Sequence, residues 1–124
     1  NNSNKKVSKW SYHKELIKSK ILISPFGYGE INLKDFEAFL YGCLLFKPNM
    51  NHLKTCPNFY QNGKTYIDFN WNLKDFKKKL EDIIENYDSY LEIARNANNF
   101  YHYYLHNKKS NDEFCLRVKT IFTD

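Results

Sequence analysis

The chain has 124 residues, the length of one domain, and its 42% hydrophobic residues can form a folded core, which excludes a chain that is disordered by composition. Its longest apolar run, residues 39–46, is too short to span a bilayer, and its polar first residues lack the apolar core of a secretory signal. The net charge of +5 comes almost entirely from lysine and favours anionic partners.

Three cysteines at irregular spacing predict neither a disulfide framework nor a zinc site. We therefore expect a reducing compartment and a cytoplasmic location. Cys43 lies within an apolar run, which predicts a buried, unreactive thiol.

The hydrophobic periodicity predicts helices that alternate with short strands. The predicted helices span 11–20, 32–42, 73–86, 89–106 and 111–122, and the predicted strands span 21–24, 43–46 and 65–69. This order favours parallel strands in a Rossmann-like three-layer α/β domain with a small sheet. We expect residues 12–124 to form this domain after a polar N-terminal segment at 1–11. Three strands are few for a doubly wound sheet, so the domain is expected to be incomplete.

Residues 32–42 carry the signals of a helix that begins after a glycine-rich turn. Asn32 is the predicted N-cap, and Gly42 is the predicted C-terminal glycine. The residues predicted to face the core follow the helical spacing: Leu33, Phe36 and Leu40. Asp35 is expected on the exposed surface of this helix.

The turn before this helix contains Gly27 and Gly29 and follows the strand at 21–24. Ligands of open α/β sheets bind at the carboxyl ends of the strands, and glycines let the backbone bend sharply and approach a ligand. The amides at 31–33 and the Lys34 side chain favour an anion at the helix start. Glu37 follows at a distance that suits hydrogen bonds from sugar hydroxyls. A purely structural turn stays an open alternative, because a Gly-x-Gly pattern is weakly specific.

The segment SPFGYGEINLKDFEAFLYGCLLFKPN, residues 24–49, resembles the donor-binding segment of GT-B glycosyltransferases, in particular the group-1 transferases and their spore-coat relatives. These families carry the pattern Asn-x-Arg-x-Phe-Glu-Ala, then a glycine five residues after the glutamate, then an apolar strand. The matching residues here are Asn32, Lys34, Phe36, Glu37, Ala38 and Gly42. The resemblance covers about residues 12–105.

The resemblance implies the C-terminal, donor-binding lobe of a GT-B fold. Such a lobe holds a nucleotide sugar, UDP- or GDP-linked, for transfer to an acceptor glycan or another acceptor. It implies that Glu37 binds the donor ribose and that the turn and helix start line the diphosphate and sugar: Phe26, Gly27, Tyr28, Gly29, Glu30, Ile31, Asn32 and Lys34. The resemblance implies no strictly required metal or other cofactor, and it assigns no catalytic residue.

The sequence departs from the family pattern in three respects. Glu30 and Glu37 are seven residues apart, where many members have two glutamates eight apart. Lys34 stands where arginine is common, so a bidentate phosphate contact is lost. The acceptor-binding N-terminal domain and the first strands of the donor domain are absent from the sequence. We therefore expect a fragment of a two-domain enzyme that does not transfer sugar by itself.

The loop after the second predicted strand supplies three further candidates for the ligand edge of the sheet: Asn49, His52 and Thr55. His102 and His106 are four residues apart, a spacing that can bind metal, but a surface pair beside an aromatic core is the favoured interpretation. The aromatic residues at 100–106 are interpreted as core packing, and the lysines at 77–79 as a solvated face.

A non-catalytic basic α/β module that binds nucleic acid or a protein partner is the alternative function, supported by the net charge and the aromatic content. A degenerate remnant with a structural role is a third interpretation. The donor interpretation involves no nucleic acid. It leaves the lysines at 77–79 free for a peripheral contact with an anionic membrane face in the cytoplasm.

Overall fold

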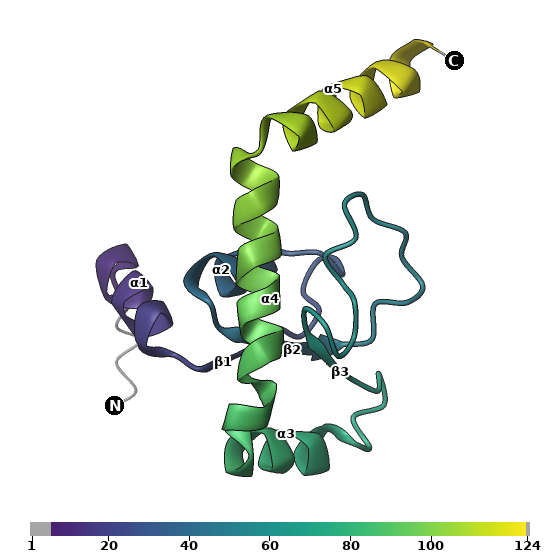
Figure 1. The fold of residues 1–124 in the computed structure, drawn as a ribbon. Helices are drawn as coiled ribbons and strands as arrows, with labels where there is room; N and C mark the ends of the chain where they lie inside the picture. Colours follow the sequence, from purple (N-terminus) through teal and green to yellow (C-terminus); the bar gives the residue numbers. More distant parts are fainter. Residues whose placement is uncertain (1–5, 124) are drawn as a thin grey trace.

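The computed structural model describes residues 6–123. Within them, helices and strands follow one another in the predicted order: α1 (Lys9–Lys18), β1 (Ile21–Ile23), α2 (Leu33–Tyr41), β2 (Leu44–Pro48), β3 (Ile67–Phe69), α3 (Phe76–Glu85), α4 (Tyr87–His106) and α5 (Lys108–Thr123). Figure 1 shows α4 as the long helix in front of the sheet and α5 leading away from it.

The first helix begins inside the segment that was predicted to be a polar extension. Residues 1–5 of that segment, like residue 124, lie outside the described residues. Ser8 is the N-cap of α1, because its hydroxyl oxygen accepts a hydrogen bond from the Ser11 amide. Leu16 is the buried residue of this helix.

The three strands form one parallel sheet in the order β1-β2-β3, which confirms the predicted pairing. Ile21 pairs with Leu44, and Phe46 pairs with Ile67. Every residue of the central strand β2 is buried. Ile23 of β1 is 40% exposed, because β1 is an edge strand of the sheet in the described residues.

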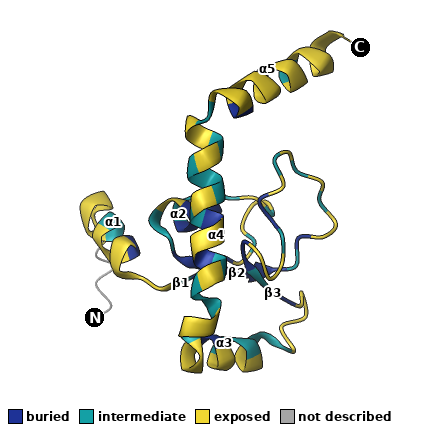
Figure 2. Cartoon of the chain, in the orientation of Figure 1, coloured by how far each residue is buried: buried dark blue, intermediate teal, exposed yellow. Residues whose placement is uncertain are grey.

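Helices cover both faces of the sheet, and alternate residues of β2 belong to two core clusters. On one face, Leu45 packs in a cluster with Phe39 of α2. On the other face, Leu44 and Phe46 pack in a cluster with Ile83 of α3. Figure 2 shows the buried residues concentrated at the sheet and on the side of α4 that faces it. The molecule is therefore a mixed α/β fold with a small parallel sheet.

The predicted buried face of α2 is wrong. Leu33 is 73% exposed and Leu40 is 38% exposed, whereas the buried residues of the helix are Asp35, Ala38 and Phe39. The helix is rotated so that its one carboxylate near the N-terminus points inward. Hydrogen-bond partners from distant segments make that burial tolerable, and the spacing of apolar residues does not reveal them.

Helix α4 contacts the amino-terminal end of the sheet. The Tyr87 hydroxyl donates to the Lys20 carbonyl, just before β1. The Asn98 side chain donates to the carbonyls of Phe39 and Leu40, at the end of α2. Ligands of open α/β sheets bind at the other end, where the strands have their carboxyl ends.

Cys43 is buried, as predicted, and its thiol donates weakly to the Leu16 and Ser19 carbonyls. Burial raises the pKa of this thiol, which keeps it protonated and unreactive. Cys56 and Cys115 are free and exposed.

Gly42 ends α2 in the left-handed region, with a φ of 74°, as its predicted role as a helix C-terminus requires. We expect Gly42→Ala to lower the free energy of unfolding by about 1–2 kcal/mol, because a Cβ is strained in this conformation. Urea denaturation monitored by circular dichroism measures the change.

The matched control is Gly29→Ala. Gly29 has no positive φ, and a Cβ built on it meets nothing within 4 Å. Its substitution should change the free energy of unfolding by less than about 0.5 kcal/mol. Equal losses in the two variants would contradict the assigned difference between these glycines.

Candidate functional site

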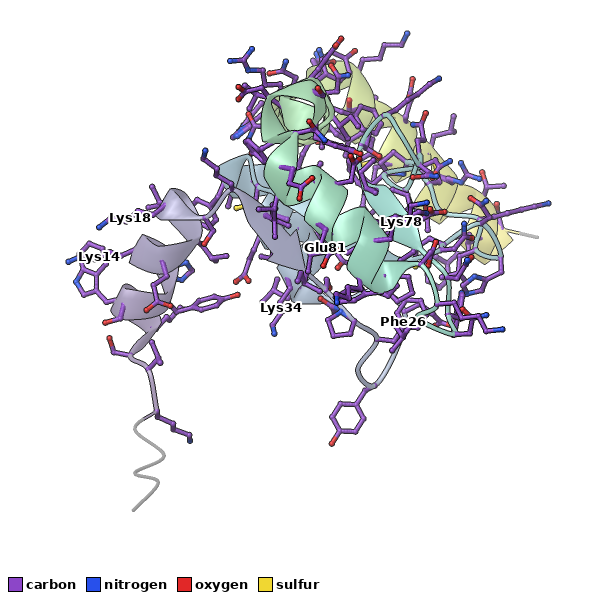
Figure 3. The ribbon with its side chains drawn as sticks, turned by 90° about the horizontal axis from the view of Figure 1, so that it is seen from below. Lys14, Lys18, Phe26, Lys34, Lys78 and Glu81 are labelled. Atoms are coloured by element: carbon purple, nitrogen blue, oxygen red, sulfur yellow. The ribbon has the colours of Figure 1, made fainter. Side chains whose placement is uncertain are left out.

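The glycine-rich turn forms one wall of a hollow at the carboxyl edge of the sheet. This hollow has a volume of about 470 Å³ and is lined by Pro25, Phe26, Gly27, Tyr28, Gly29, Ile31, Asn32, Leu33 and Lys34. It therefore brings together all the predicted donor-binding residues except Glu30 and Glu37. Figure 3 shows Phe26 and Lys34 on the same side of the molecule.

The backbone bends at the two glycines of this turn, as predicted, but the bend needs no left-handed conformation. Neither has a positive φ; the positive φ values of glycine belong to Gly42 and Gly63. A side chain at Gly27 or Gly29 would meet nothing within 4 Å, and Tyr28 between them is fully exposed. Their contribution is open space beside the backbone, which a ligand can fill.

The N-terminus of α2 is capped by its own side chains. The Asn32 side chain accepts a hydrogen bond from the Lys34 amide at 3.0 Å, and the Asp35 carboxylate accepts one from the Asn32 amide at 3.4 Å. The prediction that the amides at 31–33 are all available to an anion is therefore wrong for Asn32. Since the capping carboxylate also offsets the helix dipole, an anion here depends more on lysine side chains.

Asp35 is the centre of a buried polar network behind the turn, which corrects its predicted surface position. Its carboxylate accepts hydrogen bonds from the hydroxyls of Ser24 at 2.6 Å and Tyr60 at 2.7 Å. The Lys47 ammonium lies 3.1 Å from Asp35 Oδ2, and neither charged side chain has any exposed surface. Burial and the hydrogen bond to Asp35 raise the pKa of Tyr60, so this hydroxyl stays a donor.

Lys47 has an unusual environment for a lysine. It lies at the carboxyl end of β2, and its ammonium is 4.9 Å from the centre of the Phe26 ring. Its contact with Asp35 lacks the angular geometry of a hydrogen bond, and the nitrogen has no hydrogen-bond partner among residues 6–123. Burial lowers the pKa of this ammonium, and the Asp35 carboxylate opposes that shift.

Glu30 turns away from the hollow toward the loop after β2. Its carboxylate lies 3.4 Å from His52 Nε2. A hydrogen bond from its own backbone amide, followed by the contact with His52, lowers the pKa of Glu30. Trp71 packs against His52 at 5.2 Å and against Phe26 at 4.3 Å, measured between ring centres. Trp71 keeps 56% of its surface exposed, so it extends the rim of the site, and the sequence analysis missed it.

Of the three loop candidates, only His52 reaches the glycine-rich turn. The Asn49 side chain donates to Asp68 and accepts a hydrogen bond from the Asn51 amide, so it stabilises its own loop. The Thr55 hydroxyl is buried without a hydrogen-bond partner in the part of the chain that the structure describes.

Glu37 lies on the side of α2 that faces α1. Its carboxylate accepts a hydrogen bond from the Tyr12 hydroxyl at 2.6 Å. Tyr12 lines a second hollow of about 210 Å³ beside β1, and Lys34 lines both this hollow and the one at the turn. Lys34 therefore connects the turn with the neighbourhood of Glu37, although Glu37 itself lines neither hollow.

His102 and His106 stack on one another at 5.9 Å on α4. Residues 6–123 contain no group of three or more His, Cys, Asp or Glu side chains that could hold a metal ion. In the same residues no helix has both the length and the apolar character needed to cross a membrane.

Comparisons with protein-family models, with curated proteins and with solved structures found no match for this chain. Function must therefore be inferred from the residues of the site. These are the turn with its hollow, the buried Asp35–Lys47 pair behind it, and the two contacts that hold Glu30 and Glu37.

The Tyr12–Glu37 contact has a measurable signature. Burial and the hydrogen bond to the Glu37 carboxylate raise the pKa of Tyr12 to about 12. We expect Glu37→Gln to lower this pKa, because the negative charge that disfavours phenolate is removed, while burial keeps it above the ordinary value. The ¹³Cζ resonance of Tyr12, followed to pH 11, measures the difference. Glu81→Gln, on the exposed face of α3, is the control and should leave it unchanged.

The Asp35–Lys47 pair should show strong energetic coupling. Lys47→Met leaves the Asp35 carboxylate buried beside an apolar chain and should cost about 3–5 kcal/mol of unfolding free energy. Asp35→Asn in the same chain removes that charge, and the Ser24 and Tyr60 hydroxyls can still bond the amide. The double variant should therefore be more stable than Lys47→Met alone. Urea denaturation at pH 7 of all four proteins gives the coupling energy.

The exposed Lys77–Glu81 pair, 3.7 Å apart on α3, is the matched control for this cycle. Its coupling should be about 0.3–0.5 kcal/mol, as expected for an i, i+4 surface pair. Additive effects of Asp35→Asn and Lys47→Met would contradict a direct interaction between the buried charges.

Proposed function

We propose that the chain is the donor-binding lobe of a GT-B glycosyltransferase, which holds a nucleotide sugar for transfer to an acceptor. The observation that carries the proposal is the hollow at the carboxyl edge of the parallel sheet, between a glycine-rich turn and the start of α2. Open α/β sheets bind nucleotides at this edge. The resemblance of residues 24–49 to GT-B donor segments agrees with this location.

In this proposal the donor extends along the start of α2. The diphosphate lies at the turn, where Lys34 supplies a positive charge at the mouth of the hollow. The ribose lies toward α1, where Glu37 accepts hydrogen bonds from its hydroxyls. The Tyr12 hydroxyl, which donates to the same carboxylate, would share Glu37 with the ribose or be displaced by it. Lys34 lines both hollows, so a single ligand can extend from one to the other.

The chemical role of such a lobe is electrostatic. Breaking the bond to the sugar leaves negative charge on the nucleoside diphosphate, and positive groups fixed around it lower the barrier. Lys34 is the positive group offered at the mouth of the hollow, and the proposal requires no metal ion. The acceptor glycan would bind to a separate acceptor-binding domain. Activated nucleotide sugars in the cytoplasm would be the donors.

The test is a titration of isotope-labelled protein with UDP and GDP, followed by NMR. We expect amide resonances at 26–37 to shift in a saturable manner with at least one of the two nucleotides. Glu37→Ala should weaken that binding about tenfold, because a charge-assisted hydrogen bond to the ribose is lost. Absence of shifts at 26–37 in folded protein at millimolar nucleotide would contradict the proposal.

Glu81→Ala is the control, because it removes the same charge from the exposed surface of α3. Figure 3 shows Glu81 and Lys78 on that helix. Affinity that falls equally in the Glu81 and Glu37 variants would indicate a general effect of charge and not a ribose contact.

A further inference from the structure

The ammonium of Lys47 is buried at the edge of the sheet where ligands of this fold class bind. Lys47 is the next-to-last residue of the central strand β2 and has no exposed surface. Burying an ammonium is costly unless its donors find acceptors. Yet within residues 6–123 the nitrogen makes no hydrogen bond. The Asp35 carboxylate, 3.1 Å away, balances its charge, but the N–H groups of this buried ammonium lack a well-directed hydrogen bond, which calls for a physical explanation.

Asp35 does not supply this explanation by itself. Both of its carboxylate oxygens already accept hydrogen bonds from hydroxyls, Oδ1 from Ser24 and Oδ2 from Tyr60. The Asn32 amide is the third donor to this carboxylate, and it also bonds Oδ2. Asp35 thus balances the charge of Lys47 but does not depend on it for hydrogen bonds. Lys47 can turn its N–H groups toward another acceptor without leaving the carboxylate unsatisfied.

A single aromatic ring separates Lys47 from the hollow at the turn. The Phe26 ring lies over the ammonium at 4.9 Å, and Phe26 also lines the hollow. The residues that follow it in the turn are Gly27, the fully exposed Tyr28 and Gly29, and a side chain at either glycine would meet nothing within 4 Å. Phe26 also makes an edge contact with Trp71 and packs against the core cluster that contains Phe39. Displacement of this ring would open the ammonium to the hollow.

We propose that Lys47 is an oxyanion-binding residue, which exchanges the Phe26 ring for phosphate oxygens of the ligand in the hollow. Phosphate fits because it offers several acceptor oxygens to one ammonium and carries the charge that a buried cation favours. Lys34, which lines the same hollow, adds a second cation from the outer side. Only the identity of the ligand, a nucleoside diphosphate, rests on the proposed donor function.

Asp35, 3.1 Å from the ammonium, opposes an anion at Lys47, and Glu30 adds a second carboxylate that interacts with this ammonium. The contact of Glu30 with His52 at 3.4 Å holds it toward the loop after β2. Glu30→Gln should therefore strengthen oxyanion binding by about twofold or more, because a repulsive charge is removed.

The probe is inorganic pyrophosphate, titrated without divalent metal at constant ionic strength into the full chain. In the wild-type protein the side-chain resonances of Lys47 and the amides of Gly27 and Gly29 should shift together. The double variant Asp35→Asn, Lys47→Met keeps the net charge of the protein, so general electrostatics cannot account for a change. It should lose about tenfold or more in affinity. Lys78→Met, which removes one exposed charge from α3, should lose less than about twofold.

A second measurement uses the wild-type protein alone and does not depend on the folding of a variant. Acetic anhydride labelling with mass spectrometry should modify Lys47 slowly in the free protein, and pyrophosphate should protect it. The proposal is overturned by any of three results: no shift at Lys47 with pyrophosphate, equal affinity of the folded double variant, or labelling of Lys47 that pyrophosphate leaves unchanged.

These outcomes separate the inference from the proposed function. In one outcome, pyrophosphate binds through Lys47, and UDP and GDP bind no more tightly than pyrophosphate. This result would support the oxyanion site and contradict the donor function. Saturable nucleotide binding at 26–37 that is equal in the wild-type protein and the double variant would support the donor function and contradict the role of Lys47.

Discussion

The buried pair of Asp35 and Lys47 connects the segments that build the carboxyl edge of this small sheet. Asp35 comes from the first turn of α2, Lys47 from the end of the central strand, Ser24 from the end of β1, and Tyr60 from the long loop before β3. A charge pair without exposed surface is a weak source of stability, because desolvation opposes the attraction. Its geometric consequence is larger: the pair fixes how α2 is rotated and where the glycine-rich turn begins.

That rotation decides which parts of α2 are available to a ligand. With Asp35 pointing inward, Lys34 faces the hollow at the turn, and Glu37 faces Tyr12 on α1. The same rotation explains why the Leu33 side chain is exposed at the mouth of the hollow. At the opposite end of the sheet, α4 contacts the carbonyls before β1 and at the end of α2, and a separate hollow of about 370 Å³ lies beside Lys20 and Tyr87. The hollow at the carboxyl edge is therefore distinguished by the glycine-rich turn and Lys34 that line it.

The sequence predicted the elements well because their signals are local. Apolar runs, the caps at Asn32 and Gly42, and alternation of strands with helices all lie within a few residues of each other. Most of the turn residues that were predicted to form one site do line one hollow, since they are consecutive in the chain. The prediction was wrong at Asp35, a charged residue between Lys34 and Phe36 that looks like a surface residue. It also omitted Lys47 and Trp71, whose relation to the turn crosses more than twenty and more than forty residues.

The sequence by itself determined the order of helices and strands, their parallel arrangement and the position of the turn, because short-range patterning governs all three. Only the tertiary structure decided that Asp35 and Lys47 are paired in the interior, that Glu30 contacts His52, and that Glu37 contacts Tyr12. The physical reason is that a charged side chain can be buried only where distant segments supply its partners. Packing on the sheet brings those partners together, and no local pattern in the sequence predicts this packing.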